Sequence, residues 1–437
     1  MRISTIIKKL LNVNKAKVTD IHFGTDQYGE EVLVVRLTPY KRDLSRCGIC
    51  GCKCPQYDRG TEMRRWRALD LGIWRVMIEC FMPRVSCPIH GVVAQQVNWA
   101  RHGSRFTIDF EDTVAWLAKV ATKSVISEYM RINWRTVGGI ISRVVSDKSA
   151  PPEERFTGLI RIGIDETSYK KGHKYLLVVV NHDTGKLIWI GESKTKEELG
   201  KFFNLLTKEQ RDSIELVTAD AAQYIATTVK EYCEKAELSM DPFHVVQWAT
   251  TALDDVRKRI VRELNKTKTP KVKSKPGRPK KGEEKAKKKD PADVLKGTKY
   301  ALLKNPENLT TKQSAKLEML IISNPQMHRA YLLKEHLRMV FKLPIDEARE
   351  ELERWRGLAW RSKIPEFVAL QRTIKAHKES ILKSIELGVS NARLEAINNN
   401  IKVTIRMAYG FRNIDNLIAL LMLRNSDIDI MLPGRVA

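Results

Sequence analysis

Residues 159–191 read LIRIGIDETSYKKGHKYLLVVVNHDTGKLIWIG and contain three apolar runs separated by polar turns. The runs at 159–166, 174–182 and 186–191 predict strands, and the intervening sequence DTG at 183–185 is typical of a tight turn. Further along the chain, hydrophobic periodicity predicts a helix at 196–206, a strand at 214–219, a helix at 221–236 and a short strand that ends near residue 241. These residues therefore predict a mixed α/β core built on one sheet.

Three antiparallel strands followed by alternating helices and strands form the order expected of a ribonuclease-H-like core. Asp165 and Asp220 end two of these strands, and Glu395 lies far downstream in SNARLEAINNN, residues 390–400. Three carboxylates that converge at the rim of a sheet could hold two Mg²⁺ ions, which prefer oxygen ligands, and two such ions support in-line attack on a phosphodiester. Any one of these acids alone would more often be a solvated turn residue.

The region around Glu395 has a polar helical face. Asn391, Glu395, Asn398, Lys402 and Arg406 are spaced by four, three, four and four residues, which places them on one side of a helix. An acid flanked by amides and then by cations suits a metal-bound phosphodiester, so we expect DNA contacts here. The alternative is a solvated polar face opposite an apolar one.

The composition favours a nucleic-acid partner. The chain has 437 residues, enough for about three domains, and its 77 Lys and Arg against 52 Asp and Glu give a net charge of +25. No apolar run is long enough for a transmembrane helix, and residues 1–13 lack the pattern of a secretory signal. We therefore expect a cytoplasmic, nucleoid-associated protein with no membrane partner.

Six of the seven cysteines lie between residues 47 and 87. Cys47 and Cys50 form one CxxC pair, and Cys87 with His90 repeats the spacing, which predicts one structural, tetrahedral Cys₃His zinc site. A cluster of unligated thiols is the alternative. Cys52 and Cys54 lie beside the first pair and could replace one of its ligands.

A helix-turn-helix is predicted after this module. Apolar positions at 115–130 have helical spacing, residues 131–133 form a short turn, and Asn133 is a suitable N-cap for a helix at 134–145. The start of the second helix in this motif contacts base edges, and a plain helical hairpin is the alternative. The candidate DNA-binding residues are Trp134, Arg135, Thr136 and Arg143.

Residues 266–289 form a basic tract with 12 Lys or Arg and two Glu, a net charge of +10. Its composition predicts a flexible linker. Gly277, Arg278 and Pro279 with their basic flanks resemble an AT-hook, which inserts an arginine into the minor groove of A·T-rich DNA. The alternative is a solvated linker that binds phosphates without sequence preference.

Taken together, these segments resemble the ISL-three family of bacterial insertion-sequence transposases, which have a DDE catalytic core. The resemblance spans nearly the whole chain and rests on residues 163–166, 171–173, 175, 220–221, 241–244, 390–395, 398, 399, 402, 406 and 408–412. It implies that Asp165, Asp220 and Glu395 are the catalytic triad, that Asp241 and His244 support it, and that a helical insertion fills the interval before Glu395.

The sequence and the resemblance together predict a DNA transposase that binds the terminal inverted repeats of its element. We expect it to cut at them with Mg²⁺ or Mn²⁺, to transfer the 3′-OH into target DNA, and to act as a homodimer or larger assembly. The alternatives are a DNA-binding regulator with an inactive core, or a nuclease that does not join. The expected domains are a β-rich zinc-binding domain (1–105), a helix-turn-helix domain (106–152), the first part of the core (158–260), a helical insertion (261–388) and a C-terminal helical part of the core (389–437).

Overall fold

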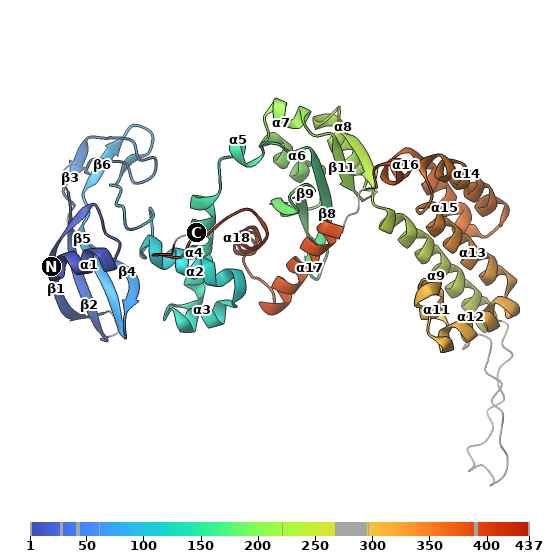
Figure 1. The fold of residues 1–437 in the computed structure, drawn as a ribbon, viewed down its shortest axis with the longest axis horizontal. Helices are drawn as coiled ribbons and strands as arrows, with labels where there is room; N and C mark the ends of the chain where they lie inside the picture. Colours follow the sequence, from blue (N-terminus) through green and yellow to red (C-terminus); the bar gives the residue numbers. More distant parts are fainter. Residues whose placement is uncertain are drawn as a thin grey trace, which may run out of the picture.

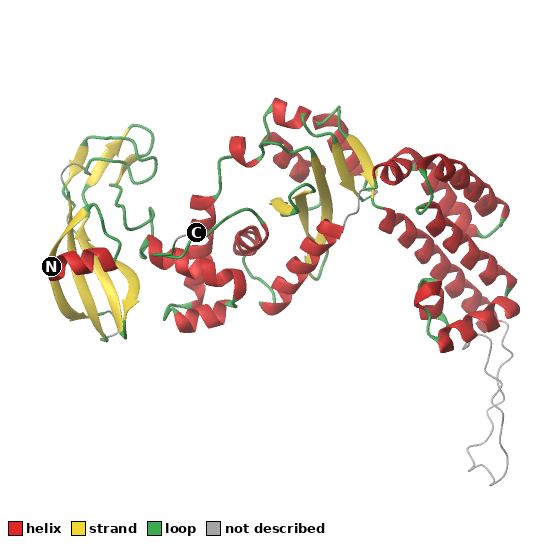
Figure 2. Cartoon of the chain, in the orientation of Figure 1, coloured by secondary structure: helices red, strands yellow, loops and turns green. Residues whose placement is uncertain are grey.

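The computed structural model describes residues 2–26, 29–40, 44–60, 62–220, 222–266, 295, 297–388 and 392–435. These residues form an elongated molecule with a β-rich unit at one end, a sheet with helices in the centre and a helical unit at the other end (Figure 1). Figure 2 shows the same division, with strands confined to the first two parts. The predicted mixed α/β architecture with a β-rich N-terminal region is confirmed.

The β-rich unit contains two sheets. The larger has the order β1-β2-β5-β4, and β1 and β2 form an antiparallel hairpin. The smaller has the order β3-β6-β7. The elements of this unit are α1 (Ile3–Leu10), β1 (Ala16–Thr25), β2 (Glu31–Pro39), β3 (Gln56–Asp58), β4 (Met63–Leu71), β5 (Trp74–Phe81), β6 (Arg84–Cys87) and β7 (Gly91–Ala94).

The segment that follows is helical, but its first helix is shorter than expected. The pattern at 115–130 predicts one helix, whereas the structure has two, because Thr122 interrupts it and caps the second helix by accepting a hydrogen bond from the Val125 amide. Asn133 caps the next helix as predicted, accepting from the Arg135 amide at 2.9 Å. The helices are α2 (Ile108–Val120), α3 (Lys123–Tyr129), α4 (Trp134–Lys148) and the short α5 (Pro152–Arg155).

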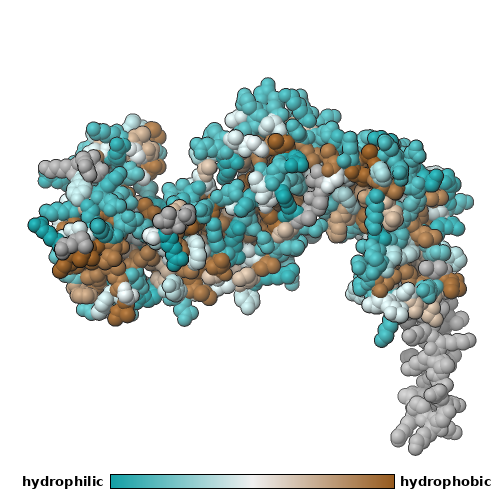
Figure 3. Space-filling model, in the orientation of Figure 1, coloured by the Kyte–Doolittle hydropathy of each residue, from teal (hydrophilic) through white to brown (hydrophobic). Residues whose placement is uncertain are grey.

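The central sheet has the order β10-β9-β8-β11-β12. The first three strands are antiparallel neighbours, and β8, β11 and β12 run parallel. The strands and the helices between them are β8 (Arg161–Lys170), β9 (Lys174–Asn181), β10 (Lys186–Gly191), α6 (Lys196–Asn204), α7 (Lys208–Asp212), β11 (Leu216–Ala219), α8 (Gln223–Tyr232) and β12 (Glu237–Met240). In Figure 3 hydrophilic side chains predominate along the edge of this part where α7 and α8 lie.

Both faces of the central sheet are buried. In β9, Leu177 and Val179 pack with α6 and α8, whereas Leu176, Val178 and Val180 pack against residues of the C-terminal helices. These C-terminal helices are α17 (Ala392–Met407) and α18 (Ile414–Asn425). The alternation of side chains along a strand explains why one apolar run serves two cores.

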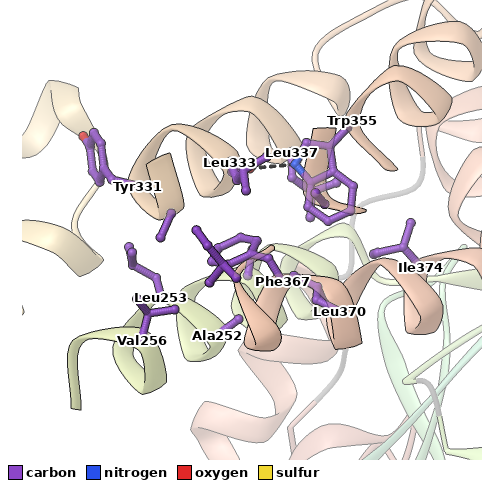
Figure 4. Close-up of a cluster of buried hydrophobic side chains, with 14 of the residues drawn as sticks. Ala252, Leu253, Val256, Tyr331, Leu333, Leu337, Trp355, Phe367, Leu370 and Ile374 are labelled. Atoms are coloured by element: carbon purple, nitrogen blue, oxygen red, sulfur yellow. Dashed lines mark hydrogen bonds between the residues drawn. The ribbon is translucent and has the colours of Figure 1, made fainter. Parts of the chain in front are cut away.

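The helical unit begins directly after β12. Its first helix, α9 (Pro242–Lys266), packs into the same core as the later helices, so the architecture changes at residue 242 and not at the expected 261. The core surrounds the fully buried Trp355, whose indole N–H donates to the Leu333 carbonyl at 2.7 Å (Figure 4). The other elements are α11 (Lys299–Leu303), η2 (Pro306–Asn308), α12 (Thr311–Ser323), α13 (Pro325–Val340), α14 (Ile345–Arg361), α15 (Pro365–Ala376) and α16 (Lys378–Leu387).

The C-terminal helices return to the centre of the molecule, where α17 lies along β8 and α18 lies against α4 (Figure 1). Ala419, Leu420 and Leu423 of α18 pack in the same core as α2, α3 and α4. The end of the chain therefore belongs as much to the helix-turn-helix segment as to the central sheet. Among the described helices, none combines the length and the apolar character needed to cross a bilayer.

Candidate functional site

Three aspartates form a row at one edge of the central sheet. Ala219 of β11 is in register with Ile164 of β8 and with Met240 of β12. The residue after each of these three is an acid: Asp220 and Asp241 directly follow the ends of β11 and β12, whereas Asp165 lies within β8, which continues to Lys170, so the prediction that Asp165 ends its strand is wrong. Because β8, β11 and β12 are parallel neighbours, this register places the three carboxyl groups at adjacent positions across the sheet.

His244, in the first turn of α9, lies between two of these acids. Its Nδ1 is 2.7 Å from Asp220 Oδ1 and 3.2 Å from Asp241 Oδ2. Burial lowers the pKa of His244, but the hydrogen bonds to both carboxylates outweigh it and raise the pKa to about 10. The imidazole is therefore a cation at neutral pH, and Asp241 also accepts a hydrogen bond from the Phe243 amide at the start of α9.

Asp165 is held by its own strand and by a helix that follows more than 200 residues later. The Glu166 amide donates to Asp165 Oδ1 at 2.7 Å, and Asn398 Nδ2 of α17 donates to Asp165 Oδ2. Burial, followed by the negative charge of Asp220, raises the pKa of Asp165 to about 6. A carboxyl group whose ionisation is disfavoured by burial and by a neighbouring carboxylate is typical of a site that a cation neutralises.

Glu395 lies near this row but does not join it. It is on α17, three residues before Asn398, and its side chain is exposed. The ligand oxygens of Asp165, Asp220 and Glu395 do not all come within 4.8 Å of one another, and the described residues give Glu395 no hydrogen bond or ion pair. The structure thus brings together Asp165, Asp220, Asp241, His244 and Asn398.

Sequence reasoning missed several residues that shape this site. Arg393 donates to the carbonyl oxygens of His182 and Asp183, which ties the start of α17 to the turn between β9 and β10. Glu166, next to Asp165, accepts from the Tyr224 hydroxyl at 2.7 Å and pairs with Lys194 at 3.1 Å. No local sequence pattern around Arg393 indicates its contact with the turn between β9 and β10. Glu166 belongs to the motif at residues 163–166, but no function was predicted for it.

A glycine is required at residue 163, near the three aspartates, because the His182 ring lies close to its backbone. His182 Nε2 lies 2.6 Å from the Thr218 hydroxyl, and a Cβ at residue 163 would lie 2.8 Å from that ring nitrogen. A hollow of about 390 Å³ also opens beside Asp220. It is bordered by Ala219, Gln223, Ala226, Leu238, Met240, Ala376 and His377, so the sheet edge and the helical unit line it together.

The four predicted zinc ligands converge in the β-rich unit. The sulfur atoms of Cys47, Cys50 and Cys87 and a ring nitrogen of His90 all lie within 4.8 Å of one another, an arrangement compatible with zinc. The Ile49 amide donates to Cys47 Sγ at 3.4 Å, which orients this thiol. Burial opposes ionisation of Cys87, but the His90 and Ile89 amides and the neighbouring thiols lower its pKa to about 7.

The other cysteines lie outside this cluster. Cys52 is exposed, whereas Cys54 is buried beside Cys87 and donates to the Cys52 carbonyl. Cys80 is buried in the core of the larger sheet, and Cys233 is buried under the central sheet.

The candidate DNA-binding residues differ in their surroundings. Trp134 and Arg135 are exposed at the start of α4, and Thr136 is partly exposed. Arg143 instead binds the buried carboxylate of Glu111, with Nε and Nη2 at 2.8 and 2.6 Å from the same oxygen. That ion pair links α4 to α2.

On α17, Lys402 and Arg406 are exposed, whereas Asn398 is buried. Asn391 and the sequence Gly277, Arg278 and Pro279 lie outside the described residues. The chain therefore presents exposed cations near the row of aspartates and near the start of α4.

Comparisons with known proteins agree across the whole chain. Residues 162–421 match a family described as "Transposase", and residues 95–145 match the "Helix-turn-helix domain of transposase family ISL3". The chain is 44% identical over 443 residues to "Transposase for insertion sequence element IS1557" of Mycobacterium tuberculosis strains CDC 1551 and H37Rv, covering 100% of this chain and 98% of the relative. It is 25% identical over 370 residues to "Transposase for insertion sequence element IS1001" of Bordetella parapertussis, covering 84% and 85%.

Proposed function

Because the chain belongs to transposase family ISL3, we propose that it moves its own insertion sequence by a metal-dependent DDE reaction. In this proposal it binds the terminal inverted repeats, cuts the DNA strand at each element end and joins the freed 3′-OH to target DNA. It would act as a homodimer or larger assembly, because an element has two ends. We also infer that it acts in the cytoplasm on the nucleoid.

The observation that carries this proposal is the row of Asp165, Asp220 and Asp241 across neighbouring strands, with Asn398 added from a distant helix. The strand order, three antiparallel strands followed by two parallel ones, supports a ribonuclease-H-like core. The proposed domain limits are those expected from the sequence, with the start of the insertion moved to residue 242.

The donor set of the site suits Mg²⁺ or Mn²⁺. Asp165 and Asp220 offer hard oxygen ligands, and burial together with the charge of Asp220 raises the pKa of Asp165, an effect that a bound cation would offset. Asn398 Oδ1 is buried and has no hydrogen-bond partner among the described residues. We propose that Asp165, Asp220 and Glu395 hold the ions, and that the ions would activate the attacking oxygen and stabilise the leaving oxygen.

The neighbouring residues would position these ligands. The His244 Nδ1–H lies within hydrogen-bond distance of both Asp220 and Asp241, so the imidazolium links these two carboxylates. Asn398 orients Asp165, and Arg393 fixes the first turn of α17 on the sheet. Since Glu395 lies between Arg393 and Asn398 on the same helix, a rotation of its exposed side chain is the movement that would bring it to the ions.

The N-terminal units would recognise the element ends. We propose that Trp134, Arg135 and Thr136 contact bases from the start of α4, and that Cys47, Cys50, Cys87 and His90 bind one structural zinc ion. Lys402 and Arg406 would hold phosphates of the element end along α17, and Asn391, outside the described residues, is proposed as a further DNA contact. Arg143 is engaged by Glu111, so we assign it to helix packing.

Purified protein with Mg²⁺ and a duplex carrying the element end tests the proposal. We expect wild-type protein to cut the strand and join it to a target duplex, and Asp165→Asn, Asp220→Asn or Glu395→Gln each to abolish both steps. Because ligands of one site act as a unit, the triple variant should be scarcely worse than any single one.

Glu215→Gln is the matched control, since Glu215 is an exposed acid at the opposite end of β11. This variant should cut and join normally. Binding without cleavage by the wild type would favour a regulator, and cleavage without joining would favour a nuclease. Normal cleavage by Glu395→Gln alone would remove Glu395 from the site and direct the search to Asp241.

A further inference from the structure

The loop between α17 and α18 presents an aromatic ring to solvent. Tyr409 is fully exposed, with 100% of its surface accessible, and its backbone has a φ of 52°. Gly410 follows with a φ of 96°. A bulky residue rarely adopts this left-handed conformation, and a fully exposed ring contributes no buried apolar surface to the stability of the fold. Both features are therefore consistent with a ring that contacts a binding partner.

Three exposed cations lie close to this ring in the sequence. Lys402 and Arg406 on α17 and Arg412 in the loop are all exposed. Within the described residues none of the three forms an ion pair, although many other arginines, such as Arg101 and Arg259, bind carboxylates. Unpaired cations beside an exposed aromatic ring are typical of surfaces that bind nucleic acid, because phosphates supply the missing anions and bases supply the stacking partner.

The loop is attached to the start of the helix-turn-helix recognition helix. Lys123 Nζ lies 5.2 Å from the centre of the Phe411 ring and 5.5 Å from the centre of the Trp134 ring, so one ammonium group joins the loop to α4. Arg424 of α18 donates to the carbonyl oxygens of Ala118 and Ala121 and to the Thr404 hydroxyl. These contacts connect α17 and α18 with the helices that precede α4.

The same loop is connected to the row of aspartates by a single helix. Asn398 contacts Asp165, and α17 continues from there to Met407. At 1.5 Å per residue these nine steps span about 14 Å, which corresponds to roughly four base pairs of duplex DNA at 3.4 Å each.

We propose that residues 408–413 are a second DNA-contact element, in which the Tyr409 ring packs against bases roughly four base pairs from the cleaved bond. Arg406 and Arg412 hold the flanking phosphates, and α17 sets the distance between this contact and the aspartates. The inference rests on the proposed function, because it requires the element end to lie along α17.

The test uses full-length protein and duplexes of the element end that carry the fluorescent base 2-aminopurine at successive positions. Wild-type protein should quench the probe most strongly roughly four positions from the cleaved bond. Tyr409→Ala should abolish this quenching and weaken binding about tenfold, whereas Tyr409→Phe should retain both, since stacking needs the ring and not the hydroxyl.

Tyr300→Ala is the matched control, because Tyr300 is an exposed tyrosine (72% accessible) on α11 of the helical unit. It should bind and quench like the wild type. Normal binding with unchanged quenching by Tyr409→Ala would overturn this inference alone. A wild-type protein that does not bind the element end would overturn the proposed function and this inference together.

Discussion

Asp165 combines burial with a close negative neighbour, and this combination makes the metal-free site unfavourable. Its pKa is raised to about 6 from a usual value of 3.8. The folded protein therefore binds a proton at Asp165 more strongly than the unfolded chain does. The contribution of Asp165 to the unfolding free energy must then fall as the pH rises from about 4 to about 6, and this penalty persists above that pH.

Replacing Asp165 should remove this penalty. We expect Asp165→Asn to raise the unfolding free energy of the metal-free central unit by about 2 kcal/mol at pH 7 and to change it little at pH 4. Calorimetric melting at the two pH values measures the difference. Mg²⁺ should stabilise the wild type and not the variant. Equal melting temperatures of both metal-free proteins at pH 7 would show that the surroundings of Asp165 do not disfavour its ionised form.

At the scale of elements, helix contacts decide where the DNA-binding segment sits. Gly138 of α4 faces Asn416 of α18 so closely that a Cβ would lie 2.8 Å from the Asn416 side chain. The adjacent Gly139 has no such neighbour, since a Cβ there would meet only the end of the Arg143 side chain at 3.7 Å. Helix packing thus requires a glycine at residue 138 but not at residue 139.

The two glycines should respond to alanine with opposite signs. Gly138→Ala should lower the unfolding free energy by about 1 kcal/mol, because the added methyl displaces Asn416. Gly139→Ala should raise it by about 0.5–1 kcal/mol through helix propensity alone. Urea unfolding followed by hydrogen exchange of α4 measures both effects, and two changes of equal sign would contradict the close packing of α4 on α18.

The cluster of Cys47, Cys50, Cys87 and His90, with the small sheet β3-β6-β7, is a second element that can be tested separately. The double variant Cys47→Ser with Cys50→Ser should lose the zinc and unfold the small sheet, since ligation energy is folding energy in such a module. Elemental analysis should find about one zinc per wild-type chain and none in the double variant, with exchange in the central sheet unchanged. Cys52→Ser, outside the cluster, should keep its zinc, and loss of metal there would make Cys52 a ligand.

At the scale of the whole molecule, charge is distributed unevenly. The net charge is +25, and residues 266–289 carry +10 of it. All but the first of these residues lie outside the described part of the chain. Charge of this kind acts on DNA through the release of counterions, which makes its contribution measurable without a fixed geometry.

Replacing residues 267–289 with a Gly/Ser segment of equal length should therefore flatten the salt dependence of DNA binding. Each DNA phosphate that the variant no longer neutralises should reduce the slope of log K against log salt by about 0.9. Arg278→Ala alone should matter most on A·T-rich duplex if the AT-hook interpretation holds. An unchanged slope would mean that this tract does not contact DNA.

Local patterns predicted the central strands, the acid that follows β11, the Asn133 cap and the convergence of Cys47, Cys50, Cys87 and His90. The prediction that Asp165 ends its strand was wrong, because β8 continues to Lys170. Local patterns also failed where the outcome depends on a distant partner. The helix breaks at Thr122 because the Thr122 side chain caps α3, although the apolar spacing continues across this residue. Arg143 is held in an ion pair because Glu111, a buried acid on α2, lies beside it. The change of architecture at residue 242 follows from core contacts that α9 makes with much later helices.

Motifs in the sequence predicted the family of this protein, and local patterns predicted the central strands and the acids Asp165 and Asp220, because periodicity, spacing and turn chemistry act over a few neighbouring residues. The packing of distant segments sets the shared register of Ile164, Ala219 and Met240, the contact of Asn398 with Asp165, and the completion of the helix-turn-helix core by α18. These contacts join residues dozens to hundreds of positions apart. Which of these contacts form depends on how the faces of entire helices and sheets pack together, and no local sequence pattern specifies that packing.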